Sequence, residues 1–161
     1  MKAIHALTQR DLPRLVEFWK EHWGDEEMIV HGDVFRPEQL GGFATEDWSG
    51  VITYFIQNDA CEIISLNSLK ENRGVGTALI DETINEARRQ NCRRLFLVTT
   101  NDNLHALGFY QRRGFELAAL RRGAVDAARQ IKPGIPPIGM NDIPLRDEIE
   151  LEISLQEDTP R

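Results

Sequence analysis

Apolar residues recur three and four positions apart in three segments of the chain. The first segment, 9–23, is followed by Gly24, and this pattern predicts an amphipathic helix that ends at the glycine. The same spacing predicts a second helix from Val75 to about Gln90 and a shorter third helix over 103–113. Each helix would turn its apolar face toward a common core.

Runs that favour β-structure alternate with short polar turns elsewhere in the chain. They occupy seven ranges: 2–7, 40–46, 50–57, 61–66, 93–100, 115–123 and 148–155. The short separators between the second, third and fourth runs are typical of β-hairpins. The order of strands and helices predicts an α+β fold with one mixed sheet and helices on both faces.

Two segments show neither the helical spacing of apolar residues nor a strand-like run. Residues 25–38 are mixed, and 124–147 begins like a helix before it becomes rich in proline and glycine. The second segment is too long for a hairpin turn, and its prolines limit the freedom of the unfolded chain. We interpret 1–161 as a single domain with an extended 124–147 connection before the last strand.

Composition narrows the class of protein. The chain has 161 residues, of which 41% are hydrophobic, which suits one globular domain with a sizeable core. Its net charge of −7 argues against nucleic acid or an anionic membrane as the main partner. The sequence shows no apolar run of ~20 residues and no signal-peptide pattern at the N-terminus. Cys61 and Cys92 lie in apolar surroundings and are expected to be buried thiols, as in a cytoplasmic protein.

The loop "ENRGVG", residues 71–76, leads into the second predicted helix. Unpaired N–H groups and the positive end of the helix dipole favour an anion there, and glycines let phosphate oxygens approach the backbone. The alternative is that Gly74 and Gly76 only form the turn. A dinucleotide-binding fingerprint would place glycine where Leu79 stands, and a P-loop would place lysine where Thr77 stands, so neither motif fits.

A second motif follows the next predicted strand. It reads Asn103-x-x-Ala106-x-x-x-Tyr110-x-x-x-Gly114-Phe115. Together with the strand ending in "ISLNSL" and the loop "ENRGVG", it resembles the GNAT superfamily of N-acyltransferases. The resemblance implies a mostly antiparallel, seven-stranded sheet flanked by helices. It also implies acetyl-CoA as co-substrate, no metal, and a homodimer as one form of the protein.

The resemblance also assigns residues to acetyl-CoA. The loop and helix start would hold the pyrophosphate, and the end of the central strand would pair with the pantetheine amides. The implied contacts are Leu66, Asn67, Ser68, Glu71, Asn72, Arg73, Gly74, Val75, Gly76, Thr77, Asn103 and Tyr110. Glu71 stands where the family usually has arginine or glutamine, so backbone N–H groups would carry most of the pyrophosphate binding.

Acyl transfer to an amine needs an acid and a base. The resemblance makes Tyr110 the acid that protonates the departing CoA thiolate, although the residue also fits a core aromatic position. Glu62 lies between apolar neighbours on the central strand, on the face that it is expected to share with Ile64 and Leu66. It is the first candidate for the base, and the alternative is an ion pair with an arginine across the sheet. His31 is the second candidate, and Asp147 with Glu148 form the third. These last three residues are also the predicted substrate contacts.

The sequence therefore predicts an N-acetyltransferase that acts on a primary amine. A catalytically silent acyl-CoA sensor or interaction module on the same fold is the alternative. A stiff 124–147 segment over the acceptor cleft would favour a small molecule over a protein tail. The alternative is that this segment only covers a sheet edge or forms a dimer contact. Acidic residues in both irregular segments favour a cationic amine, whereas Arg36 and Arg146 could instead hold a substrate carboxylate.

Overall fold

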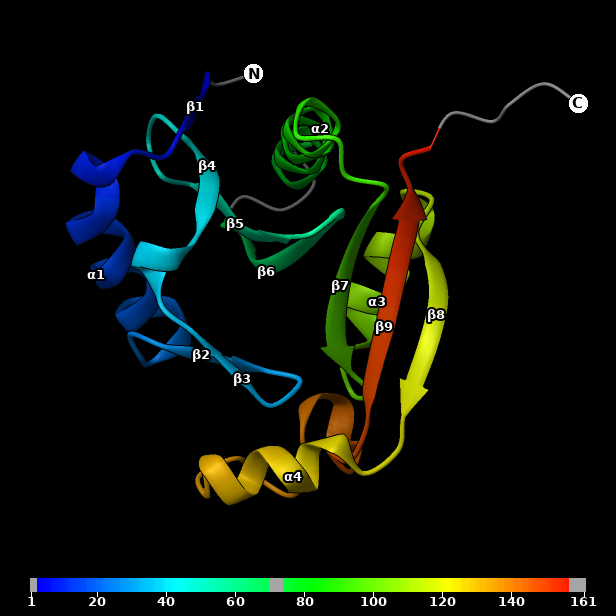
Figure 1. Cartoon of the computed structure of the whole chain (residues 1–161). Helices are drawn as coiled ribbons and strands as arrows, with labels where there is room; N and C mark the ends of the chain where they lie inside the picture. The colour runs from blue at the N-terminus through cyan, green and yellow to red at the C-terminus, as the bar shows by residue number, and fades with distance from the viewer. Residues whose placement is uncertain (1–2, 70–73, 157–161) are drawn as a thin grey trace, which may run out of the picture. The chain divides into compact units, whose positions relative to one another are not determined.

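The computed structural model describes residues 3–69 and 74–156 (Figure 1). The chain divides into two compact units, which we describe separately. Unit 1 comprises 1–28, 35–95 and 154–161, and unit 2 comprises 29–34 and 96–153. In the part of the chain that the structure describes, no helix is both long and apolar enough to cross a membrane.

The strands of unit 1 follow the predicted hairpins. They are β1 (Ile4–Ala6), β4 (Gly41–Thr45), β5 (Gly50–Gln57) and β6 (Ala60–Ser68). Each is antiparallel to the next, with Phe43 opposite Ile52 and Ile52 opposite Leu66. All four strands form where they were predicted: β5 has the predicted bounds, β1 and β4 are shorter than predicted, and β6 is longer, from Ala60 to Ser68.

Two helices complete unit 1. Helix α1 (Leu12–Trp23) follows a 3-10 turn that Thr8 and Asp11 cap reciprocally, and it ends at Gly24 in the left-handed conformation. Helix α2 (Val75–Arg89) packs against β4, β5 and β6 through an apolar face that includes Leu79. Both helices begin and end close to their predicted limits.

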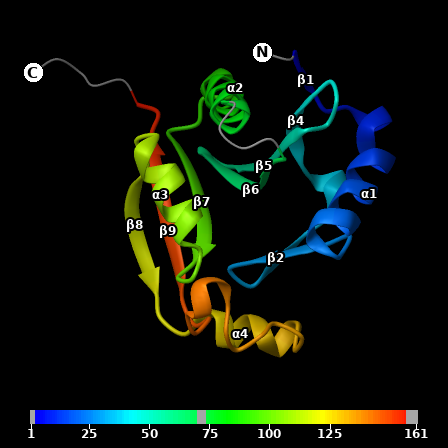
Figure 2. The same cartoon turned by 180° about the vertical axis from the view of Figure 1, so that it is seen from behind.

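Unit 2 is built on the later strands. It contains most of β7 (Arg94–Thr100), together with β8 (Glu116–Arg121) and β9 (Glu148–Ser154). The views from the front and from behind both place α3 (Leu104–Arg112) against one face of these strands (Figures 1 and 2). A fourth helix, α4 (Ala124–Ile131), follows β8 and confirms the helical start of the 124–147 segment.

The seven strands follow the order β1-β4-β5-β6-β7-β9-β8 in one mostly antiparallel mixed sheet. The predicted α+β class and the seven-stranded sheet are therefore confirmed. A separate two-stranded sheet of β2 (Met28–Val30) and β3 (Asp33–Phe35) lies in the segment left unassigned above. Its strands are too short to show a period of two, and its turn at His31 and Gly32 has positive φ at both residues.

Candidate active site

The start of α2 has the predicted turn from loop into helix, in the part that the structure describes. Gly74 adopts φ +73°, which favours glycine, and its carbonyl accepts the first helical hydrogen bond from Ala78 N at 3.0 Å. Val75 and Gly76 are buried, and the first turn contains no acidic side chain. The predicted contacts Glu71, Asn72 and Arg73 lie outside the described residues.

Gly50 fixes how closely α2 approaches the sheet, which the sequence analysis missed. A Cβ atom at this position would collide with Cγ1 of Val75 and would lie 3.0 Å from Cδ1 of Leu79. The absence of a side chain at Gly50 therefore lets the first turn of α2 pack directly on β5. An isolated glycine at the start of a strand indicates close backbone approach, but it does not identify the partner.

The end of β6 is paired with β5 along its whole length. Leu66, Asn67 and Ser68 lie opposite Ile52, Val51 and Gly50. The side chain of Asn67 accepts a hydrogen bond from Nε1 of Trp23 at 2.9 Å. Asn67 therefore has a structural role through its side chain, and its contact with the pantetheine arm stays a prediction.

A β-bulge changes the predicted face of the base candidate. The register places Thr53 opposite Ser65 but Tyr54 opposite Ile63, so one residue of β6 is extra. Glu62 lies opposite Phe55, on the face that carries Thr53 and Ser65, and not on the face of Leu66. The expectation that Glu62 and Leu66 share a face is therefore wrong, because period-two alternation is interrupted at the bulge.

Glu62 is only 4% exposed, beside the equally buried Cys61. Burial raises the pKa of the Cys61 thiol to about 12. Cys61 and Cys92 are both free and buried, which confirms their predicted state. A thiol with so high a pKa stays protonated near neutral pH and is a poor nucleophile, so Glu62 is the stronger candidate for proton chemistry on this stretch of β6.

Tyr110 meets the requirements of an acid and of a core residue together. Its ring packs edge-on against Phe109 and Phe115, with centroids 5.2 and 5.4 Å away, and the residue is 8% exposed. Burial raises the pKa of its hydroxyl, which therefore keeps its proton at neutral pH. No hydrogen bond between described residues uses this hydroxyl, and its role as the acid stays a prediction.

Asn103 caps the helix that carries Tyr110. Its Oδ1 accepts from Ala106 N at 3.1 Å, and its Nδ2 donates to Oγ1 of Thr99 at 3.3 Å. Both contacts fix the start of α3 relative to the end of β7. Asn103 is therefore the N-cap of α3, and its contact with acetyl-CoA stays a prediction.

The predicted substrate contacts all lie in unit 2. His31 pairs with Asp33 across 3.2 Å in the β2–β3 turn. Asp147 directly precedes β9, and its Oδ1 accepts from Gly123 N at 2.9 Å. Glu148 is buried at the first position of β9. The carboxylate of Asp147 thus holds the start of α4, and the substrate role of all three residues stays a prediction.

Asn101 and Asp102 hold the long connection to the end of β7, and the sequence analysis did not identify them. Oδ1 of Asn101 accepts from the backbone N–H groups of Arg146 and Asp147 at 3.1 and 3.0 Å. The buried carboxylate of Asp102 accepts from Oγ1 of Thr100 at 2.5 Å and from Met140 N at 2.8 Å. The connection is therefore anchored by side chains next to the family motif.

These features can be set against known proteins. The acetyltransferase (GNAT) family model matches residues 2–115. The chain belongs to the GNAT family. This GNAT protein is 46% identical over 139 residues to the uncharacterized protein YdhI of Bacillus subtilis strain 168, with 84% of this chain and 87% of YdhI covered. It is 43% identical over 143 residues to YxbD of the same strain, with 86% and 90% covered.

Solved structures share the fold of this GNAT protein. An acetyltransferase from Bacillus subtilis in complex with CoA aligns with a TM-score of 0.68 at 18% identity, covering 97% of this chain and 100% of the other. A GNAT family acetyltransferase from Elizabethkingia anophelis with acetyl-CoA bound aligns at 0.65 and 22% identity, covering 94% and 97%. Within the described ranges, no group of three or more His, Cys, Asp or Glu side chains is placed to hold a metal ion.

Replacing Asp102 by alanine tests the anchor of the connection. We expect the free energy of unfolding to fall by about 1–2 kcal/mol, because the part-buried N–H of Met140 loses the carboxylate that accepts its hydrogen bond. Urea denaturation measures the loss, and amide exchange should show Met140 losing protection. Asp81→Ala, at an exposed position on α2, is the control and should change stability by less than about 0.5 kcal/mol. Unchanged protection of Met140 in the Asp102 variant would contradict the anchoring role.

Proposed function

We propose that this GNAT protein transfers the acetyl group of acetyl-CoA to the primary amine of a small molecule by direct attack. The neutral amine nitrogen attacks the thioester carbon, the carbon–sulfur bond breaks, and the amide forms. Glu62, directly or through water, takes the proton that the amine loses. Tyr110 gives a proton to the departing thiolate, so atoms and charge balance across the two groups.

The observation that carries this proposal is the state of Tyr110. Burial raises the pKa of this hydroxyl, so it keeps its proton at neutral pH, and no hydrogen bond between described residues uses it; the proton is therefore in place when the thiolate departs. The family match and the glycine-capped start of α2 support acetyl-CoA as the ligand. Anchoring of the 124–147 segment by Asn101 and Asp102 supports a small acceptor over a protein tail.

The direct test is turnover. The protein is incubated with acetyl-CoA and a panel of primary amines, and release of the free thiol is followed together with the mass of the acetylated product. Transfer to at least one amine supports the enzyme, with a lysine-bearing peptide as the comparison for a protein acceptor. Binding of acetyl-CoA without transfer to any amine would favour the silent sensor instead.

The role of Glu62 predicts a particular pH dependence. Glu62→Gln should lower kcat/KM roughly tenfold near neutral pH, less than the full effect of a lost base, because water can take the proton. The loss should shrink as pH rises toward ~10, the pKa of an alkylamine, because more amine is already neutral. Rate profiles measured from about pH 6.5 up to about pH 10, the pKa of an alkylamine, test this.

Glu46→Gln is the matched control, since it removes the same charge from an exposed position in unit 1. It should leave the pH profile unchanged. An equal loss at every pH in the Glu62 variant would point to positioning or folding, and His31→Ala would then be the next variant to measure.

A further inference from the structure

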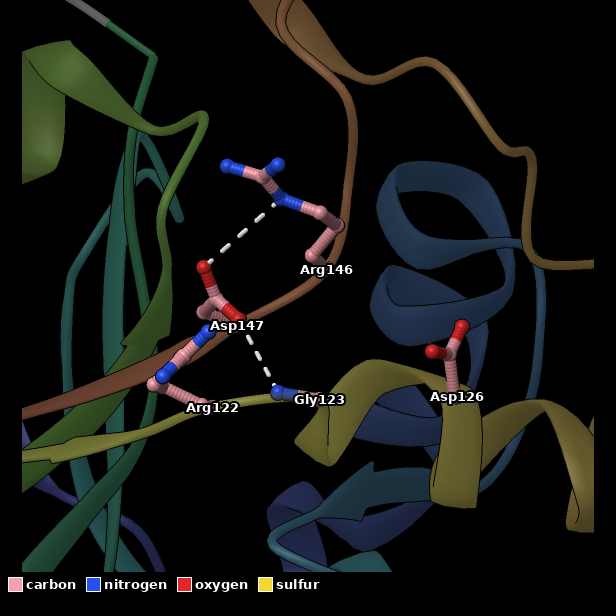
Figure 3. A pocket seen from close by; sticks show the side chains of 5 residues that line it. All are labelled: Arg122, Gly123, Asp126, Arg146 and Asp147. Atoms are coloured by element: carbon pink, nitrogen blue, oxygen red, sulfur yellow. Dashed lines mark hydrogen bonds and ion pairs between the residues drawn. The ribbon is translucent and has the colours of Figure 1, made fainter.

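A cavity of about 460 Å³ opens in unit 2 where β8, α4 and β9 meet. Four of the five residues that line it have charged side chains; the five are Arg122, Gly123, Asp126, Arg146 and Asp147 (Figure 3). The volume falls within the range of small-molecule sites. Most small-molecule sites have apolar walls with a few polar groups, so a lining of this kind indicates recognition by charge.

The two aspartates of the lining already have partners. Asp126 forms an ion pair with Arg129 at 2.6 Å, and Arg129 in turn donates to backbone carbonyls of the connection. Oδ1 of Asp147 accepts the N–H of Gly123, so this carboxylate occupies the position in front of α4. The positive end of the α4 dipole is therefore already paired with the carboxylate of Asp147.

The two arginines of the lining are much less committed. Arg122 is exposed, and among the described residues its guanidinium has no hydrogen bond or ion pair. Arg146 is 64% exposed in its side chain and faces Asp147 only across 3.8 Å, too far for a hydrogen bond. Figure 3 shows the side chains of Arg122 and Arg146 on either side of Asp147, with Asp126 apart from them on α4.

The backbone that carries Arg146 is held firmly. Asn101 accepts from Arg146 N and Asp147 N, and its Nδ2 donates to Pro144 O at 2.9 Å. Val125 N donates to Arg146 O at 3.0 Å, which ties the same residue to α4. An arginine on a fixed backbone loses less conformational freedom when it binds a ligand, so these contacts prepare the cavity for an anion.

We propose that this cavity binds a carboxylate on the acceptor molecule, held by Arg122 and Arg146. Two guanidinium charges against the carboxylate of Asp147 leave a net charge of +1, since Asp126 is balanced by Arg129. One carboxylate neutralises that charge, whereas a phosphate monoester would exceed it. Planar guanidinium groups also match the geometry of a carboxylate. The assignment of this ligand to the acceptor rests on the proposed function, and the acceptor would then be an amino acid or a longer amino carboxylate.

The test compares two probes that differ in one group. Binding of 5-aminopentanoate and of pentylamine is measured by titration calorimetry with CoA present, so that no turnover is needed. The carboxylate probe should bind at least about tenfold more tightly, as expected for charge-assisted hydrogen bonds. Arg122→Met and Arg146→Met should each remove most of this difference, and the double variant should remove all of it without changing the affinity for pentylamine.

Arg88→Met is the matched control, because Arg88 is an exposed arginine on α2 and is remote in sequence from the cavity. It should retain the full preference for 5-aminopentanoate. Equal affinity of the wild type for both probes, or a preference that survives in the double variant, would overturn the proposal. Tighter binding of 5-aminopentyl phosphate than of the carboxylate would overturn the choice of ligand.

Kinetics separate this inference from the proposed function. If the wild type acetylates amines without any advantage for the carboxylate, the cavity assignment fails and the transferase stands. If the carboxylate probe binds through the two arginines but no amine is acetylated, the cavity is a carboxylate site. The proposed transferase activity is then wrong, and so is the assignment of the carboxylate to an acceptor.

Discussion

Replacing Tyr110 by phenylalanine is expected to lower kcat for acetyl transfer about 100-fold, the loss usual for a missing general acid. The change removes only the hydroxyl, while the edge-on contacts of the ring with Phe109 and Phe115 are kept. Because burial raises the pKa of this hydroxyl, the wild type carries the proton across the whole physiological range. Affinity for acetyl-CoA and the melting temperature should change little, and steady-state kinetics with both measurements tests this.

Tyr54 is the other tyrosine of the chain and supplies the control. It lies on β5, and burial raises the pKa of its hydroxyl to about 12, so the two residues share a protonated, desolvated phenol. Tyr54→Phe should keep nearly full kcat. Full activity of the Tyr110 variant would show that Tyr110 serves packing alone, and equal losses in both variants would indicate a general effect on the core.

Much of the fold follows from local patterns. The helix that begins at Val75 was predictable because its apolar period is regular and a glycine precedes it. The hairpin at His31 and Gly32 was not, because each strand has only three residues and its turn lacks the usual asparagine or aspartate. Period and turn chemistry therefore identify long elements and miss the shortest ones.

Residues of the candidate site could be predicted from the sequence only where they belong to a recognisable motif. Tyr110 and Asn103 follow from the family motif, and the cap of α3 by Asn103 is a local contact. Gly50, Asn101 and Asp102 act on residues more than twenty positions away, and nothing in their local sequence names those partners. The bulge in β6 is likewise a property of the pair β5–β6, so the face of Glu62 could not be obtained from its own strand.

Replacing Gly76 by aspartate is expected to abolish binding of acetyl-CoA. Gly76 is buried in the first turn of α2, where a pyrophosphate would meet backbone N–H groups, and an aspartate there adds bulk and a repelling charge. At a ligand concentration of 100 Kd, acetyl-CoA should stabilise the wild type by about 2.7 kcal/mol. For a chain of this length that is a rise in Tm of roughly 5–10 °C, and the variant should show no rise.

The control for this experiment keeps the charge and moves it along the helix. Asn85→Asp adds one negative charge at an exposed position of α2, about 13 Å further along the axis. Because backbone N–H groups are unpaired only in the first turn, the added charge is far from any bound pyrophosphate and the Tm rise should persist. A full rise in Tm with acetyl-CoA in the Gly76 variant would show that the pyrophosphate does not bind at the start of α2. If no acyl-CoA stabilises the wild type, acetyl-CoA is not its co-substrate, and the proposed acetyltransferase activity is wrong.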